Sequence, residues 1–195
     1  MPDPVDEDRD GSNNSLWENN NLKSADNVLF VTKDIPGRGK GLVAAIKISA
    51  QTQVLAETPI LKLSVELDDE TEIEEVVKAF QHLTVRNQEA FLSLSKFASD
   101  VYQSQPIWGS LSDEHKQVIA AWGANNWNDM VFETGCRINH ACVPNLATSW
   151  NERSGKQEWV ARRDIEVGEE LTGTYIYDIG KFRIGKSSED ARIKR

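Results

Sequence analysis

The sequence predicts an α+β protein in which β-strands dominate and one block of helices is inserted between two β-rich parts. Three observations support this class. Short strand-like runs occupy residues 28–63, apolar residues at helical spacing occupy about 70–125, and strand-like runs return over 146–175. The apolar period therefore changes from strand to helix and back along the chain. The length of 195 residues suits one domain with a sizeable core.

Both ends of the chain are expected to lie outside the folded domain. The first 27 residues hold seven acidic and two basic residues but few apolar ones. They cannot bury enough surface to offset the entropy of ordering, so they are predicted to form a disordered acidic leader. Residues 179–195 are predicted to be a polar C-terminal tail, which leaves 28–178 as a single domain.

Composition argues against several classes of function. The formal net charge of −9 disfavours broad electrostatic binding to nucleic acid or to anionic lipid. It suits a basic protein partner, although acidity that only aids solubility explains the same charge. No apolar run reaches the length of a membrane span, and the N-terminus lacks the features of a secretory signal. Two cysteines are too few for a disulfide framework, so we expect a nuclear or cytoplasmic protein.

The N-terminal β-rich part is predicted to hold three strands. A β-like run covers residues 28–31, and two further strands cover 42–48 and 54–63. Residues 49–52 form the turn between the last two. These runs are short and rich in β-branched residues, which is typical of small sheets.

The central part is predicted to be helical. Its first helix is indicated by apolar residues that fall on one helical face, which are Ile73, Val76, Val77, Phe80 and Leu83. Phe91, Leu92 and Leu94 indicate a second helical piece. A third helix is expected to begin after Ser112, because serine is a good N-cap and acidic residues in a first turn are favoured by the helix dipole.

The C-terminal β-rich part returns to strand patterns. Strands are predicted over 146–150 and 158–162, with 151–155 as the hairpin turn between them. A last strand is predicted over 170–175. The insert of about 70–125 therefore lies between two β-rich parts.

A glycine-rich loop joins the first two predicted strands. Gly37, Gly39 and Gly41 alternate with Arg38 and Lys40. Glycines let backbone approach a ligand closely and take positive φ. The spacing differs from a phosphate-binding loop and from a dinucleotide fingerprint, and no helix opens after it. Taken alone, the loop is a hairpin turn.

Two longer motifs change this interpretation. Residues 137–145 have the pattern R-x-N-H-x-C-x-P-N, and residues 168–175 have the pattern G-E-E-L-T-x-x-Y. Together with the glycine loop, in this order and spacing, they resemble the core of the SET-domain protein-lysine methyltransferases. The match covers roughly residues 34–176. It is most similar to finger-less fungal SET proteins, which have a SMYD-like core without the MYND zinc finger.

The resemblance implies a fold and a cofactor. Family members build several small sheets of the β-clip type around a knot-like crossing, and they use S-adenosyl-L-methionine. The glycine loop lines the cofactor pocket, so Arg38, Gly39 and Lys40 are implied to meet the cofactor mainly through backbone atoms. Asn139 and His140 are implied to hydrogen-bond it, because an amide offers both a donor and an acceptor. Asn145 is expected to shape its loop.

The resemblance also implies a catalytic residue and a substrate. The family places a tyrosine at the end of the G-E-E-L-T strand, which here is Tyr175. The reaction is an in-line attack of a neutral lysine amine on a methyl group, so alignment and exclusion of water do the work. The substrate is a protein lysine, in a histone or in another protein. Tyr177 and Phe182 are candidate walls of the lysine channel, with ordinary packing as the alternative.

The remaining motif residues are expected to be structural. Glu169 and Glu170 form a turn into a strand and are not predicted to act as an acid–base pair. Cys142 is expected to be a buried thiol, because Cys136 is the only other cysteine and a zinc site needs about four ligands. No bound metal is therefore predicted.

One departure from the family leaves an alternative open. Family members usually continue past the tyrosine with a cysteine-rich post-SET segment that closes the lysine channel. After residue 176 this sequence is glycine-spaced and charged, so that segment is expected to be lacking and turnover to be slow. The alternative function is a catalytically weak or inactive SET-like module that acts in protein–protein interaction.

Overall fold

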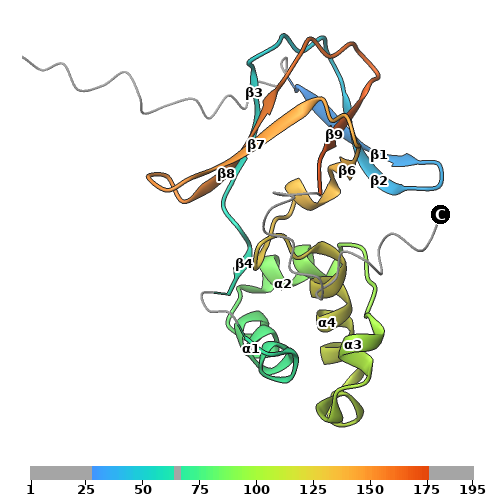
Figure 1. The fold of residues 1–195 in the computed structure, drawn as a ribbon, viewed down its shortest axis with the longest axis vertical. Coiled ribbons are helices and arrows are strands. Elements are labelled where there is room, and N and C mark those ends of the chain that lie inside the picture. Colours follow the sequence, from blue (N-terminus) through green and yellow to red (C-terminus); the bar gives the residue numbers. More distant parts are fainter. Residues whose placement is uncertain (1–27, 64–66, 176–195) are drawn as a thin grey trace, which may run out of the picture.

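The computed structural model describes residues 28–63 and 67–175 (Figure 1). A β-rich part lies above a helical part in this view, and the chain passes between them twice. Strands and helices take up roughly equal shares of the described residues, so the α+β class is confirmed but the expected dominance of strands is not. The predictions for the leader, the polar tail, Tyr177 and Phe182 fall outside the described residues.

The sheet that carries the motifs has four strands in the order β1-β2-β9-β6. They are β1 (Phe30–Ile35), β2 (Gly39–Ala44), β9 (Glu170–Gly173) and β6 (Asn139–His140). β2 runs antiparallel to both β1 and β9, whereas β6 runs parallel to β9. The strand predicted over 42–48 begins earlier, because the glycine loop itself pairs with β1, and it ends at Ala44.

The second sheet has the order β3-β8-β7, and a third sheet pairs β4 with β5. These strands are β3 (Gln53–Glu57), β8 (Lys156–Ala161), β7 (Leu146–Asn151), β4 (Leu61–Lys62) and β5 (Met130–Val131). The strand predicted over 54–63 is two strands, because Pro59 between them cannot donate a ladder hydrogen bond. The turn before β3 uses Gln51 at a positive φ of 65°, where glycine is the usual residue.

The helical part contains four α-helices among the described residues. The α-helices are α1 (Asp69–Gln81), α2 (Val85–Leu92), α3 (Asp100–Gln103) and α4 (Asp113–Asn125). One 3₁₀ turn, η1 (Pro106–Ser110), lies between α3 and α4, and a second 3₁₀ turn, η2 (Gly135–Arg137), lies between β5 and β6. Ser112 caps α4 as predicted, since its side chain accepts a hydrogen bond from the His115 backbone N–H.

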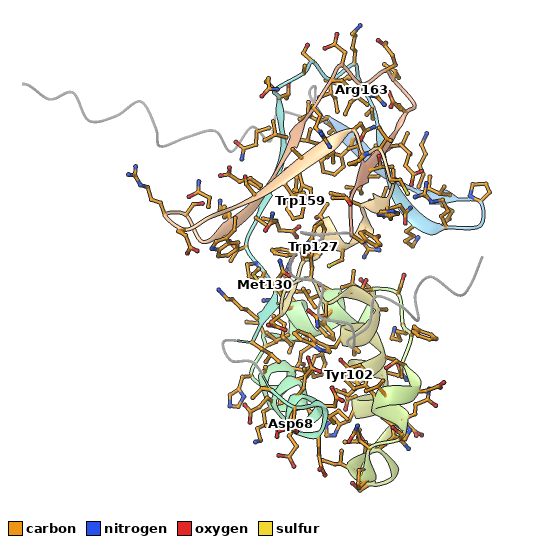
Figure 2. All side chains as sticks on the ribbon, viewed as in Figure 1. Asp68, Tyr102, Trp127, Met130, Trp159 and Arg163 are labelled. Atoms are coloured by element: carbon orange, nitrogen blue, oxygen red, sulfur yellow. The ribbon has the colours of Figure 1, made fainter. Side chains whose placement is uncertain are left out.

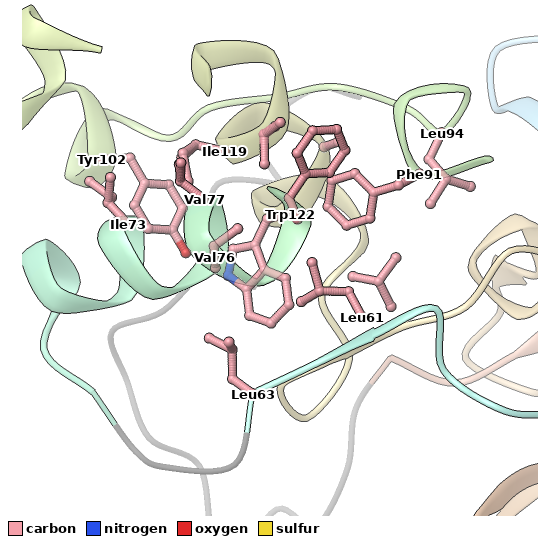
Figure 3. Packing of buried hydrophobic residues seen from close by; sticks show 14 residues of the cluster. Leu61, Leu63, Ile73, Val76, Val77, Phe91, Leu94, Tyr102, Ile119 and Trp122 are labelled. Atoms are coloured by element: carbon pink, nitrogen blue, oxygen red, sulfur yellow. The ribbon is translucent and has the colours of Figure 1, made fainter. Parts of the chain in front are cut away.

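Each part has its own apolar core. The helical core surrounds Trp122 and Phe91, both fully buried (Figure 3). The β core surrounds Trp159, also fully buried. Cys136 packs against both cores, and Trp127 and Met130 lie where the two parts meet (Figure 2). The site described next is built on the β core.

Among the described residues, none of the helices combines the length and the apolar character required to cross a lipid bilayer.

Candidate functional site

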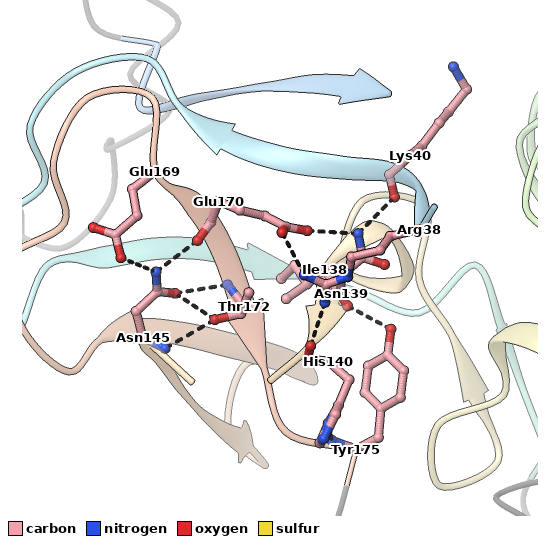
Figure 4. A network of polar contacts seen from close by, with 10 residues as sticks. All are labelled: Arg38, Lys40, Ile138, Asn139, His140, Asn145, Glu169, Glu170, Thr172 and Tyr175. Carbon is pink, nitrogen blue, oxygen red and sulfur yellow. Dashed lines mark hydrogen bonds and ion pairs between the residues drawn. The ribbon is translucent and has the colours of Figure 1, made fainter. Parts of the chain in front are cut away.

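The motif residues converge where β6 and the β1–β2 hairpin flank β9 (Figure 4). Because β9 lies between β2 and β6, it brings the glycine loop beside a segment about 100 positions later in the sequence. The residues predicted to bind the cofactor therefore gather in one place. They are Arg38, Gly39, Lys40, Asn139 and His140.

Glu170 joins the two sides of this cluster. Its Oε2 atom lies 2.7 Å from Nη1 of Arg38, and its Oε1 atom accepts a 2.8 Å hydrogen bond from Nδ2 of Asn139. The second amide hydrogen of Asn139 is directed at the Lys40 carbonyl oxygen, 3.4 Å away. Arg38 also donates from Nη2 to the His140 carbonyl oxygen. A single carboxylate thus connects the glycine loop to the β6 motif.

Gly41 makes room for this connection. A Cβ atom at this position would lie 2.9 Å from Nδ2 of Asn139 and 3.0 Å from Oε1 of Glu170. It would also lie 2.6 Å from the Ile35 side chain. Contacts this short force neighbours to move. The third glycine of the loop is therefore required by the packing beneath the site.

Asn145 holds the loop that follows β6, as the sequence predicted. It is 2% exposed and accepts the Thr172 backbone N–H at 2.8 Å. Its Nδ2 atom donates to the Glu170 carbonyl oxygen at 2.8 Å and to Oε1 of Glu169 at 3.1 Å. Glu169 also pairs with Arg163, and this hydrogen bond lowers the pKa of Glu169 to about 2. Asn145 and Glu169 thus hold the loop and the turn into β9 in place, which is the structural role expected of them.

Tyr175 follows β9 and faces the β6 motif. Its hydroxyl donates to the Ile138 carbonyl oxygen at 2.9 Å, and its backbone N–H donates to Nδ1 of His140 at 3.0 Å. Its ring packs against the His140 ring at 5.3 Å and the Trp127 ring at 6.3 Å between centroids. Burial of the hydroxyl raises the pKa of Tyr175 to about 12, although half of the residue's surface is exposed. The phenol is therefore neutral near pH 7.

Cys142 is exposed, which corrects the prediction of a buried thiol. The motif leaves the sheet after His140, so the following loop points outward and Val143 is 89% exposed. Sγ of Cys142 lies 3.6 Å from Nε2 of His140. The interior thiol is Cys136, which accepts from the Phe132 N–H and donates to a backbone carbonyl. Burial raises the pKa of Cys136 to about 12.

Sequence reasoning missed the anchor of the segment that leads into β6. Glu57, at the end of β3, accepts hydrogen bonds from the backbone N–H groups of Thr134 at 2.9 Å and Gly135 at 2.8 Å. Burial raises the pKa of Glu57. Gly135 packs directly on Trp159, where a Cβ atom would lie 2.4 Å from the indole. No local pattern reveals a carboxylate that acts on a loop 77 positions away.

The part of the chain that the structure describes contains no group of three or more histidine, cysteine, aspartate or glutamate side chains arranged to hold a metal ion. The absence of zinc from the protein stays a prediction.

Comparison with known proteins identifies the family. A family model described as the SET domain matches residues 39–176, which is more than half of the chain. The matched region begins at β2 and includes both motifs, the helical part and Tyr175. The chain therefore belongs to the SET-domain family.

The chain is also similar in sequence to curated fungal proteins. The chain is 35% identical over 148 residues to "Histone-lysine N-methyltransferase set5" of Schizosaccharomyces pombe, an alignment that covers 76% of this chain and 42% of that protein. It is 35% identical over 66 residues to "Histone-lysine N-methyltransferase SET5" of Meyerozyma guilliermondii, covering 33% of this chain and 14% of that protein. The chain thus spans less than half the length of these relatives.

Among solved structures, CpSET8 from Cryptosporidium has a TM-score of 0.41 and 18% sequence identity, with 76% of this chain and 58% of that chain covered. This likeness is too weak to support an argument about the site.

Proposed function

We propose that the chain is an S-adenosylmethionine-dependent protein-lysine N-methyltransferase acting on a histone or another protein in the nucleus or cytoplasm. The observation that carries the proposal is the meeting of Asn139, His140 and Tyr175 at the β6–β9 pair of a SET domain. The names of the curated relatives, which are histone-lysine methyltransferases, support the same reaction. The acidic net charge suits a lysine-rich substrate.

The groups presented at the site fit the methyl donor. Both amide hydrogens of Asn139 are directed at acceptors, and no donor within residues 28–63 and 67–175 contacts its Oδ1 atom. An amide oxygen in this position can accept from an ammonium group. Gly39 has a positive φ of 70°, and apart from its chain neighbours no atom of residues 28–63 and 67–175 lies within 4 Å of where its Cβ would be, which leaves room for a ligand beside this residue. We propose that Arg38, Lys40 and His140 complete the cofactor site.

Tyr175 is the proposed catalytic residue. When bound, S-adenosylmethionine supplies a methyl group on a positively charged sulfur, which a neutral lysine amine attacks in line. Because the Tyr175 hydroxyl donates its hydrogen to the Ile138 carbonyl, its oxygen would be left to accept a hydrogen bond from a lysine amine. Tyr175 would thereby hold the amine in a fixed orientation for the transfer. Tyr177 and Phe182, outside the described residues, are proposed as walls of the lysine channel.

The test is methyl transfer from labelled S-adenosylmethionine to histones and a panel of lysine peptides. We expect Tyr175→Phe to reduce transfer by about 10²-fold, because the amine loses its alignment. Affinity for S-adenosylhomocysteine should change little. Tyr102→Phe is the matched control, since that hydroxyl lies in the helical core, and it should transfer methyl groups normally. Cofactor binding without transfer to any lysine protein would instead favour a non-catalytic binding module.

A further inference from the structure

The orientation of the Asn139 amide is set by its surroundings. Its Nδ2 atom faces Oε1 of Glu170 at 2.8 Å and the Lys40 carbonyl oxygen at 3.4 Å. A carboxylate can only accept hydrogen bonds, so the amide turns its NH₂ group toward Glu170. The 3.4 Å contact with the Lys40 carbonyl is compatible with this orientation but is too long to impose it. The amide oxygen is consequently directed away, as an acceptor for whatever binds at the site.

Glu170 is itself held firmly enough to impose this orientation. It begins β9, the strand that pairs with β2 on one side and β6 on the other. Its other oxygen is paired with Arg38 at 2.7 Å, and its side chain is 19% exposed. The ion pair with Arg38 holds the carboxylate in place, and a carboxylate has no hydrogen to donate. The missing side chain of Gly41 leaves the space that the Asn139 and Glu170 side chains occupy.

We propose that Glu170 is a positioning residue that makes the cofactor site selective for the ammonium group of the methyl donor. It acts through Asn139 and does not touch the ligand. With its NH₂ group bonded to the Glu170 carboxylate, Asn139 presents only an acceptor, which favours a ligand that donates. Without that carboxylate, the amide can turn over and present its NH₂ group, which disfavours an ammonium. The inference rests on the proposed function, because the ligand is taken to be S-adenosylmethionine or its product.

The test compares two ligands in one variant. Glu170→Gln keeps the shape of the side chain, but its amide can donate as well as accept and therefore no longer fixes the orientation of Asn139. Calorimetric titration should be done with S-adenosylhomocysteine and with its analogue that lacks the α-amino group. In the unmodified chain we expect S-adenosylhomocysteine to bind about 10-fold more tightly than the analogue, the size expected of a hydrogen bond to a charged group.

In Glu170→Gln this ratio should fall toward one, because binding of S-adenosylhomocysteine weakens while binding of the analogue does not. The ratio is taken on the same preparation, so partial unfolding lowers the binding capacity but not the ratio of dissociation constants. Glu169→Gln is the matched control, since the neighbouring carboxylate is bonded to Arg163 and Asn145 and not to Asn139. It should keep the ratio of the unmodified chain.

A double-mutant cycle tests that Glu170 acts through Asn139. Asn139→Ala should itself bring the ratio near one, and adding Glu170→Gln should cause no further change. If Glu170 has only a general structural role, Glu170→Gln should weaken the binding of both ligands equally. That result would overturn the proposal while leaving the proposed function intact. An unmodified chain that binds neither ligand would overturn the proposed function and this proposal with it.

Discussion

Glu72 in the helical part and Glu170 in the β-rich part are both carboxylates that connect distant segments, yet their surroundings differ. Glu72 is 5% exposed and accepts hydrogen bonds from Tyr102 at 3.0 Å and from the Trp122 indole at 3.3 Å. Glu170 is paired with the Arg38 guanidinium and with the amide of Asn139 and joins the two sides of the motif cluster. The first carboxylate is enclosed by the apolar core, whereas the second supports groups that remain accessible.

The comparison distinguishes carboxylates that stabilise the fold from carboxylates that orient the groups offered to a ligand. A carboxylate surrounded by core side chains stabilises the packing of α1 against α3 and α4. A carboxylate beside a half-exposed cluster fixes the orientation of neighbouring polar groups. We therefore expect substitutions in the helical part to change the free energy of unfolding, and substitutions around Glu170 to change ligand affinity.

The largest effects are expected from the two central tryptophans. Trp122→Ala and Trp159→Ala each remove a fully buried indole, so each should lower the free energy of unfolding by about 3–5 kcal/mol. Only Trp159→Ala should also weaken the binding of S-adenosylhomocysteine, because Trp159 supports Gly135 on the segment that leads to Asn139. Urea unfolding and calorimetry measure the two quantities. Equal losses of affinity in both variants would show that the two parts are not separable in this way.

A smaller effect is expected from the hydrogen bond inside the helical core. Tyr102→Phe removes a donor from the buried Glu72 carboxylate, which should lower the free energy of unfolding by about 1.5–3 kcal/mol. Ligand affinity should stay the same. In a Glu72→Gln background the same change should cost less, because the carboxylate charge is gone. An undiminished cost in that background would assign the loss to packing instead of to the hydrogen bond.

Asn139→Ala is expected to change affinity instead of stability. It removes the amide oxygen offered to the cofactor, so binding of S-adenosylhomocysteine should weaken by about 1–3 kcal/mol. The residue is only half-buried, so its free energy of unfolding should change less than in the two tryptophan variants. Calorimetric titration showing full affinity in this variant would remove Asn139 from the site and leave the pocket without its assigned acceptor.

The fold was predictable where its signals are local. The α1 and α4 helices follow from apolar spacing and from N-caps such as Ser112, and these are properties of a few neighbouring residues. The β6 strand was missed, because it has two residues and exists through parallel pairing with β9. The short α3 helix was also missed, since four residues carry no periodic pattern.

That the candidate site residues lie close together was predictable from the motifs, but the hydrogen bonds between them were not. The motifs indicated that the glycine loop, the Asn139–His140 pair and Tyr175 belong together, and the fold brings them together. The pairing of Glu170 with Arg38 joins positions 132 apart, and the sequence around neither residue indicates its partner. The exposure of Cys142 was predicted wrongly, because the direction of a loop leaving a two-residue strand depends on tertiary structure.

The smallest effect is expected at Glu169, and it sharpens the contrast with its neighbour Glu170. The pKa of Glu169 lies at about 2 in the folded chain, below its ordinary value of 4.5, because Arg163 and then Asn145 hydrogen-bond its carboxylate. A group whose pKa is lowered by folding contributes stability above the unfolded pKa and loses it as pH falls toward the folded one. The pair lies at the surface and is screened by solvent, so the contribution should be only about 0.2–1 kcal/mol.

Urea unfolding at several pH values should therefore show Glu169→Gln less stable than the unmodified chain above pH 4.5, with the difference shrinking as the pH falls toward about 2. High salt should shrink it further, and cofactor affinity should be the same in both proteins. A difference that grows as the pH falls would mean that the carboxylate destabilises the fold, and a loss of affinity would mean that Glu170 shares its positioning role with the residue beside it.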